Sequence, residues 1–428
     1  MSRPLLHIPV ERHRLDNGLR VNLSLDRTVP VVSVNLWYGV GSRNERPGRT
    51  GFAHLFEHMM FQGSAHVPKN RHFELIERAG GSLNATTWFD RTNYFETVPS
   101  HHLELALWLE SDRLGWMLPA MTAEKLENQR DVVLNEKRQR YENQPYGDWD
   151  EHMQAMLFPP SHPYHHTVIG ATEDIEAATL EDVAEFFETF YVPNNAVLTL
   201  CGDFDREHAL DAVRRWFGDI PPGAPPPPLP GEPDVDPVLG EEVRRRLEAD
   251  VPLPRVILGM RVPPFTDERF HTAEVAGAVL GTGRASRLYR RLVREQRIAK
   301  DAVAYVFPLV TGASMMLVWA TGVKGVDEET LEAALAAELE ALADVGADEV
   351  ERAVTLTVAR VVRSLEQAGE RADLLSMYDT IFDDPARVNV EIERLHAVSV
   401  DDVRAFAEAF LGRDNRAVLT YVPRTEEP

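Results

Sequence analysis

The two halves of this 428-residue chain repeat one pattern, and a proline-rich segment separates them. In the first half, an amphipathic stretch at Leu180–Phe190 leads through a short polar turn into an apolar, strand-like run. The same order recurs at Val400–Phe410, and Thr179 and Ser399 precede the two stretches as plausible helix N-caps. Two copies so far apart indicate duplicated domains rather than a short-period solenoid.

The segment between the halves, residues 221–231, is dominated by proline and is expected to form a semi-rigid, polyproline-like linker. A chain of 428 residues also exceeds what one hydrophobic core usually organises. We therefore expect a first domain at residues 1–220, a linker at 221–237 and a homologous second domain at 238–428.

Within the first half, strand and helix signals are mixed without a strict alternation. Such a mixture favours the α+β class. The runs that predict strands alternate apolar and polar residues or surround a turn, whereas the runs that predict helices carry apolar residues at helical spacing. Strands are expected at 20–25, 31–38 and twice within 82–98, and helices at 51–61, about 68–79 and 123–143.

Composition excludes several classes of partner and site. The chain has 45 Lys and Arg against 68 Asp and Glu, and its net charge of −23 argues against nucleic acid and anionic membranes as partners. Cys201 is the only cysteine, which excludes an intrachain disulfide and a zinc cluster of thiolates. The N-terminus lacks the apolar core of a signal peptide, so we expect a cytoplasmic location unless an export signal has been removed.

A single helical turn carries the residues with the clearest chemical meaning. His54, Glu57 and His58 lie three and four positions apart, so they share one face of the predicted helix. Two imidazoles at this spacing suit Zn²⁺, and a carboxylate beside them suits a base for a zinc-bound water. The order is that of the inverted zinc peptidase motif and predicts peptide hydrolysis. Two solvated histidines on a surface helix are the alternative, but the apolar neighbours argue for a buried helix.

A catalytic zinc site needs a third protein ligand. Glu136, on the predicted long helix, is a candidate, but spacing alone does not separate it from other downstream glutamates or from a solvated helix face. His162, His165 and His166 form a histidine-rich loop that we expect to be solvated.

Several segments together resemble one known family. The run GFAHLFEHMMFQG at 51–63 is similar to the zinc-binding signature of the pitrilysin/insulysin-type metallopeptidases, the inverzincins. The run QRDVVLNE at 129–136 resembles the segment that carries their distal zinc glutamate, and further similarity lies at 81–87, 191–195 and 280–289. The resemblance implies two homologous domains, each with a mainly antiparallel sheet packed against helices.

The same resemblance assigns the metal and its ligands. It implies one Zn²⁺ per chain, held by His54, His58 and Glu136, with Glu57 as the general base. Gln129 stands where the family commonly has an acid near the zinc ligands; its amide could orient a ligand but adds no charge, so zinc affinity is expected to be reduced.

The resemblance also suggests where substrate binds. Asn84, Ala85 and Thr86 would form an exposed edge strand near the zinc, to which an extended peptide adds by backbone hydrogen bonds. An ordinary surface strand after the Gly80-Gly81 turn is the alternative. A chamber between the domains, as in the family, would favour short or unfolded peptides.

One departure from the family pattern concerns the second half. Family members that cleave alone supply an Arg and a Tyr from that half, but the corresponding run ASMMLVWA at 313–320 contains no Arg. In the two-subunit, processing-peptidase-like branch, an inactive homologue provides them. We therefore predict a zinc-bearing subunit that works with a homologous non-catalytic subunit, or as a homodimer. The alternative is a non-catalytic scaffold or binding subunit, which the intact ligand set opposes.

Overall fold

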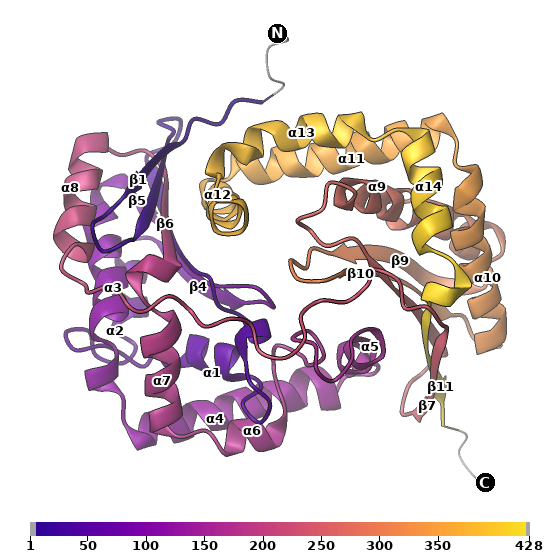
Figure 1. Ribbon diagram of the computed structural model, residues 1–428, viewed down its shortest axis with the longest axis horizontal. Helices are drawn as coiled ribbons and strands as arrows, with labels where there is room; N and C mark the ends of the chain where they lie inside the picture. The colour runs from indigo at the N-terminus through magenta and orange to yellow at the C-terminus, as the bar shows by residue number, and fades with distance from the viewer. Residues whose placement is uncertain (1–5, 425–428) are drawn as a thin grey trace. The chain divides into compact units, whose positions relative to one another are not determined.

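The computed structural model describes residues 6–424, and these form two compact units, each built around one β-sheet (Figure 1). Neither unit is a continuous piece of sequence. The first contains residues up to Glu136, His166–Pro230 and Val362–Val390, and the second contains Lys137–His165, Gly231–Val361 and residues from Glu391 onward.

The sheet of the first unit has six strands in the order β1-β2-β6-β3-β5-β4. Among the described residues, β2 and β6 form its one parallel pair, and β4 is an edge strand that pairs with β5. The strands are β1 (Glu11–Arg14), β2 (Arg20–Leu25), β3 (Val31–Tyr38), β4 (Ser82–Thr87), β5 (Thr92–Pro99) and β6 (Ala196–Gly202).

The sheet of the second unit repeats this topology in the order β7-β11-β8-β10-β9. Its parallel pair is β7 with β11, which corresponds to β2 with β6, and the remaining pairs are antiparallel in both sheets. Five strands of the first sheet, all but β1, thus match the five strands of the second in order, which confirms the predicted duplication and the α+β class. The strands are β7 (Val243–Ala249), β8 (Arg255–Val262), β9 (Ala299–Phe307), β10 (Ser314–Gly322) and β11 (Ala417–Pro423).

Helices cover the first sheet. Helix α3 packs against β3 and β5, and α12 packs against β3 and β6. The contact with α12 is polar: Trp37 Nε1 of β3 donates to Asp373 Oδ1 at 2.7 Å. The helices of this unit are α1 (Phe52–Met59), α2 (Arg71–Arg78), α3 (Leu103–Trp116), α4 (Ala123–Lys137), α6 (Thr172–Glu176), α7 (Leu180–Phe190), α8 (Arg206–Phe217) and α12 (Ala368–Phe382).

The second sheet is covered in a related way. Helix α5 packs against β8 and β11, where a Cβ at Gly259 would lie 2.3 Å from Met153 Sδ, so only glycine allows this close approach. Leu258 and Met260, on either side of Gly259, belong to the hydrophobic core that the other helices help to form. The remaining helices are α5 (Trp149–Leu157), α9 (Phe270–Gly281), α10 (Glu328–Glu340), α11 (Ala347–Glu366), α13 (Val388–Ala397) and α14 (Val400–Phe410).

The compact units therefore differ from the linear division at residues 220 and 238. Each sheet receives a helix from the other half of the sequence: α12 packs on the first sheet and α5 on the second. A sheet with two faces to cover needs helices on both, and here the second layer comes from a distant segment. One boundary between the units, after Pro230, does lie within the predicted linker.

The repeated helices begin as the sequence predicts. Thr179 and Ser399 are the N-caps of α7 and α14, and each side chain accepts a hydrogen bond from the backbone N–H of Asp182 or Asp402. Both aspartates return a bond to the cap residue, which completes a capping box in each copy.

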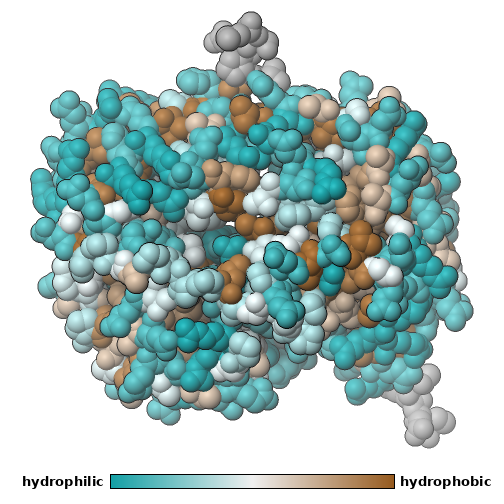
Figure 2. All heavy atoms as spheres, viewed as in Figure 1, coloured by the Kyte–Doolittle hydropathy of each residue, from teal (hydrophilic) through white to brown (hydrophobic). Residues whose placement is uncertain are grey.

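The face of the molecule shown in Figure 2 is mainly hydrophilic. On the face shown in Figure 2, hydrophilic side chains cover most of the surface, and hydrophobic ones form small groups among them. Within residues 6–424, no helix combines the length and the apolar character that crossing a membrane requires.

Candidate metal centre

Helix α1 is short and is held in place by its apolar face. Phe56 is 2% exposed, and its ring centroid lies 4.2 Å from that of Tyr191, inside a cluster of aromatic rings that includes Phe186 and Phe187. This packing turns the opposite face of the helix, with its histidines and glutamate, toward α4. The local sequence forms the helix, and the aromatic cluster orients it.

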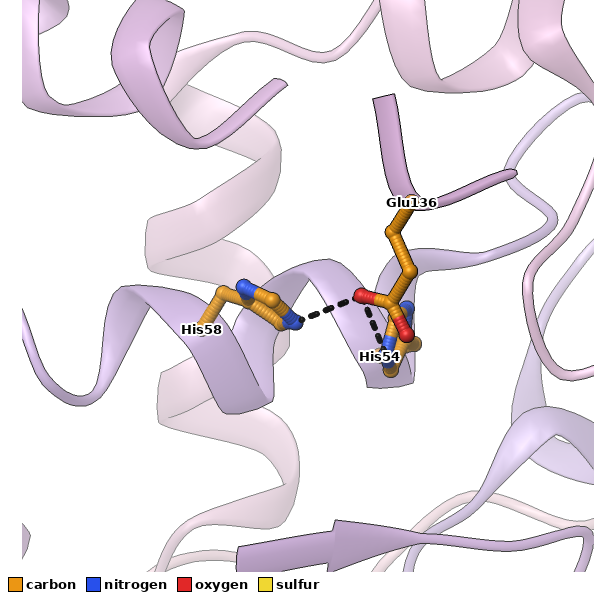
Figure 3. A group of neighbouring side chains, drawn as sticks. All are labelled: His54, His58 and Glu136. Carbon is orange, nitrogen blue, oxygen red and sulfur yellow. Dashed lines mark ion pairs between the residues drawn. The ribbon is translucent and has the colours of Figure 1, made fainter. Parts of the chain in front are cut away.

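Three predicted ligands converge from two helices (Figure 3). His54 and His58 lie one turn apart on α1, and Glu136 is the last residue but one of α4. Glu136 Oε2 lies 3.8 Å from His54 Nε2 and 3.5 Å from His58 Nε2. The three side chains are mostly buried, with exposed fractions of 11%, 21% and 19%.

These residues fit a zinc ion. Ligand atoms of a tetrahedral zinc ion, each about 2.0–2.1 Å from the metal, stand roughly 3.3 Å from one another. The three candidate donor atoms lie within 4.8 Å of one another, with one carboxylate oxygen between the two imidazole nitrogens. Two neutral nitrogens and one carboxylate oxygen form a donor set that zinc accepts, and three protein ligands leave a fourth position for water.

Glu57 lies beside these residues, and a hydroxyl group that the sequence did not reveal binds it. Thr87 Oγ1, at the end of β4, donates to Glu57 Oε2 at 2.6 Å. Burial raises the pKa of the Glu57 carboxyl group, whereas this hydrogen bond and the neighbouring His58 lower it. Thr87 is thirty positions away along the chain. No local spacing signals this contact, although Thr87 ends the run of family resemblance at 81–87.

Asn84, Ala85 and Thr86 lie on the predicted edge strand. They belong to β4, which pairs on one side with β5, and within residues 6–424 no strand pairs with its other side. The backbone N–H of Ala85 donates to Asn84 Oδ1 at 2.9 Å. A cavity of about 690 Å³ adjoins β4 and the first turn of α12. Most of the residues that line it are polar, among them Ser33, Asn35, Asn84, Thr86, Asn93 and Asp373.

Gln129 lies on α4 two turns before Glu136 and is buried, with 7% of its surface exposed. Its amide nitrogen donates to Asn128 Oδ1 at 2.9 Å. Its role in orienting a zinc ligand therefore stays a prediction.

A second group of possible ligands lies elsewhere in the first unit. His72, Glu96 and Glu110 are all buried, and their candidate donor atoms lie within 4.8 Å of one another. The buried guanidinium of Arg113 already pairs with Glu110, and burial together with this cation lowers the pKa of His72 to about 3. Because Arg113 supplies the positive charge, we assign no metal to this cluster.

The histidine-rich loop differs from the expectation that it is solvated. His162 is only 2% exposed, and its Nε2 lies 3.0 Å from the carbonyl oxygen of Pro233. His165 Nδ1 lies 2.7 Å from the carbonyl oxygen of Phe158. These rings make backbone contacts that only the folded chain brings together, so the solvated interpretation was wrong.

Family models match most of the chain. Residues 20–159 match the model described as insulinase, peptidase family M16. Residues 177–356 match the model described as the peptidase M16 inactive domain. The first match contains His54, Glu57, His58 and Glu136.

Individual relatives agree with the family models. The zinc protease PqqE of Helicobacter pylori is 30% identical over 85% of this chain and 82% of that protein. A probable mitochondrial-processing peptidase subunit beta of Arabidopsis thaliana is 28% identical over 63% of this chain and 50% of that protein. The crystal structure of a protease from Helicobacter pylori superimposes with a TM-score of 0.90 at 26% identity, and covers 97% of this chain and 100% of that one. Sequence and fold agree, and the chain belongs to peptidase family M16, with relatives in its processing-peptidase-like branch.

Proposed function

We propose that this protein is a zinc-dependent endopeptidase of the inverzincin type, with one Zn²⁺ held by His54, His58 and Glu136. The observation that carries the proposal is the convergence of these three donors, with the carboxylate of Glu57 on the same helix face. Relatives that are named zinc proteases support it.

Glu57 acts as the general base in this proposal. When bound, the zinc ion supplies Lewis acidity, which lowers the pKa of a water ligand toward about 7 and polarises the peptide carbonyl. Glu57 accepts a proton from the attacking water and returns it to the nitrogen of the leaving amine. Thr87 donates to one oxygen of Glu57 and so holds the carboxylate in one orientation.

The substrate in this proposal is an extended peptide that pairs with β4 at Asn84, Ala85 and Thr86. An edge strand binds a peptide mainly through backbone hydrogen bonds, so it selects an extended conformation more strongly than a sequence. Short or unfolded peptides can adopt this conformation, whereas a folded domain cannot without local unfolding. The polar cavity beside β4 supports this proposal.

We further propose that a homologous subunit completes the active enzyme. Strand β10 pairs on both sides, with β8 and β9, and its residues 314–322 include no arginine. A similar relative is named as the beta subunit of a mitochondrial-processing peptidase. A non-catalytic homologue would supply the missing Arg and Tyr, and a homodimer is the alternative assembly.

A non-catalytic scaffold is the second candidate function. Residues 177–356 match a model described as an inactive domain, and Gln129 replaces an acid near the ligands. The two candidate functions differ in whether Glu57 has a catalytic role, because a scaffold needs no general base beside the metal.

Metal analysis combined with a quenched-peptide assay tests the proposal. We expect one zinc per chain, and cleavage that increases when an arginine-bearing homologue is added. Glu57→Gln should keep the zinc and lose at least about a hundredfold in kcat, because a general base contributes about 10²–10⁴. His58→Ala should lose both zinc and activity. Full zinc without turnover, even with the homologue present, would favour the scaffold, and normal turnover by Glu57→Gln would refute the assigned base.

A further inference from the structure

The amino end of helix α1 lacks a capping side chain of its own. Its N-cap residue is Gly51, which adopts a left-handed conformation with φ of 83°. A Cβ at this position would lie 2.5 Å from the carbonyl oxygen of Ile169 and 2.6 Å from Ile175 Cδ1. Ser, Thr, Asp and Asn, which usually cap helices, therefore cannot stand here. The free N–H groups of the first turn must find an acceptor elsewhere.

Glu45 provides that acceptor from the preceding loop. Its Oε2 accepts the backbone N–H of Gly51 at 2.8 Å, and its Oε1 accepts the backbone N–H of Ala53 at 2.7 Å. The Glu45 side chain is fully buried, and His166 Nδ1 lies 3.5 Å from Oε2. A buried carboxyl group that uses both oxygens on one helix end is restricted to a single position. Burial raises the pKa of Glu45, whereas the hydrogen bonds from the backbone N–H groups of Ala53 and Gly51 lower it.

The loop that carries Glu45 is itself anchored. Asn44 Oδ1 accepts the backbone N–H of Gly41 at 3.0 Å, and Arg43 pairs with Asp90 at 2.9 Å. Groups outside α1 thus set the position of Glu45. Through its two hydrogen bonds, Glu45 in turn fixes the position of the first turn of α1.

We infer that Glu45 is a positioning residue for the proposed metal site. This inference rests on the proposed function. Ala53, whose N–H binds Glu45, immediately precedes His54, so the carboxyl group fixes the Phe52–Ala53 peptide unit, one residue before the first ligand. His58 follows one turn later on the same eight-residue helix. Loss of the contact should let the first turn of α1 fray and move His54 relative to His58 and Glu136.

The test compares two carboxylate-to-amide changes at helix ends of the same unit. Glu45→Gln retains the size of the side chain but turns one amide NH₂ toward a backbone N–H. Asp205→Asn is the matched control, because Asp205 Oδ1 caps α8 by accepting the N–H of His208 at 2.9 Å, and α8 carries none of the proposed ligands. Zinc affinity is measured by chelator competition, site geometry by the cobalt(II) absorption spectrum, and α1 by amide exchange in the metal-free protein.

We expect Glu45→Gln to weaken zinc binding about 10- to 100-fold, the range found for residues that orient metal ligands, and to alter the cobalt spectrum. Amide exchange at residues 52–54 should become faster. Asp205→Asn should bind zinc like the wild type. Equal zinc affinity and equal cobalt spectra for both variants would overturn the inference and leave Glu45 a purely structural cap.

Two further results keep the test decisive. If Glu45→Gln does not fold, Glu45→Asp replaces it in the test. The shorter side chain cannot reach both N–H groups, so zinc affinity should fall to an intermediate value. An unchanged zinc affinity would overturn the inference. A wild-type protein that binds no zinc would instead overturn the proposed function, and the inference with it.

Discussion

Glu57 and Thr87 illustrate how much of the proposed chemistry depends on single contacts. Glu57 belongs to a motif that is readable from spacing, but its orientation comes from a hydroxyl at the end of β4. The same strand is the proposed binding edge for the peptide. Strand β4 would therefore both orient the proposed general base and bind the proposed substrate.

Removal of the Thr87 hydroxyl should lower the rate without changing substrate binding. Thr87→Val keeps the shape of the side chain but loses the donor to Glu57, and a hydrogen bond to a charged group contributes about 1.5–3 kcal/mol. We expect kcat to fall about tenfold with little change in KM, as measured by steady-state peptide cleavage. Thr87→Ser, which retains the hydroxyl, is the control. A kcat for Thr87→Val equal to that of Thr87→Ser would contradict this role.

At the residue scale, the sequence indicates which side chains share a face when the residues are close in sequence. His54, Glu57 and His58 share a helical face because of their spacing, and the structure places them on one helix. Glu136 was assigned by family resemblance, since helical spacing says nothing about a residue on another helix. Thr87 and Glu45 were not identified, because each acts through a contact that forms only when separate elements pack.

Among the elements, α12 shows how a distant segment becomes part of the first unit. Its Asp379 is fully buried and accepts hydrogen bonds from Arg12 at 2.7 Å, Asn22 at 2.8 Å and Arg20 at 3.2 Å. These donors lie on β1 and β2 of the first sheet. One carboxylate thus ties the helix to two strands more than three hundred residues earlier.

Neutralisation of Asp379 should destabilise the first unit strongly. Breaking a buried ion pair by changing one partner costs about 3–5 kcal/mol, because the remaining charges lose their compensation. We expect a loss of this size for Asp379→Asn in urea unfolding. Asp383→Asn is the matched control: Asp383 also pairs with Arg12, but its side chain is 80% exposed, so the expected loss is below about 1 kcal/mol. Equal losses would show that burial of Asp379 does not govern the stability of this contact.

Element-level prediction was accurate for type and less so for extent. The capping boxes at Thr179 and Ser399 marked two helix starts correctly. The single helix predicted at 123–143 is instead an α-helix that ends at Lys137, followed by a π-helical stretch at Arg138–Glu142. Periodicity does not distinguish these forms over so few residues.

In the molecule as a whole, the linker is held by a histidine. The N–H of Tyr164 donates to His162 Nδ1 at 3.0 Å, so Nε2 carries the proton and donates to the carbonyl oxygen of Pro233. Pro233 lies in the predicted linker. The contact with Tyr164 requires the neutral imidazole, because a protonated Nδ1 cannot accept the N–H. Burial lowers the pKa of His162 to about 4.

Stability should therefore decline in mild acid. The pKa of His162 in the folded protein, about 4, is below the value of about 6.5 expected in the unfolded chain, so the unfolded chain binds the proton more readily. The contribution is fully present above pH 6.5 and falls as the pH decreases toward 4, by roughly 2–3 kcal/mol. We expect urea unfolding of His162→Asn to depend less on pH in this window. His101→Asn, at an exposed position, should behave like the wild type. A wild-type curve that is equally flat would contradict this role.

The sequence by itself determined the features that depend on local order: the helical face with His54, Glu57 and His58, the capped repeat of helix and strand, and the linker between the halves. Only the tertiary structure decided which helix covers which sheet, that Glu136 lies near the two histidines, and that Thr87 contacts Glu57 and Glu45 contacts the first turn of α1. The physical reason is range: side-chain spacing within a helix or strand follows from backbone geometry, whereas contacts between elements depend on how buried faces pack, and one sequence pattern is compatible with many such partners.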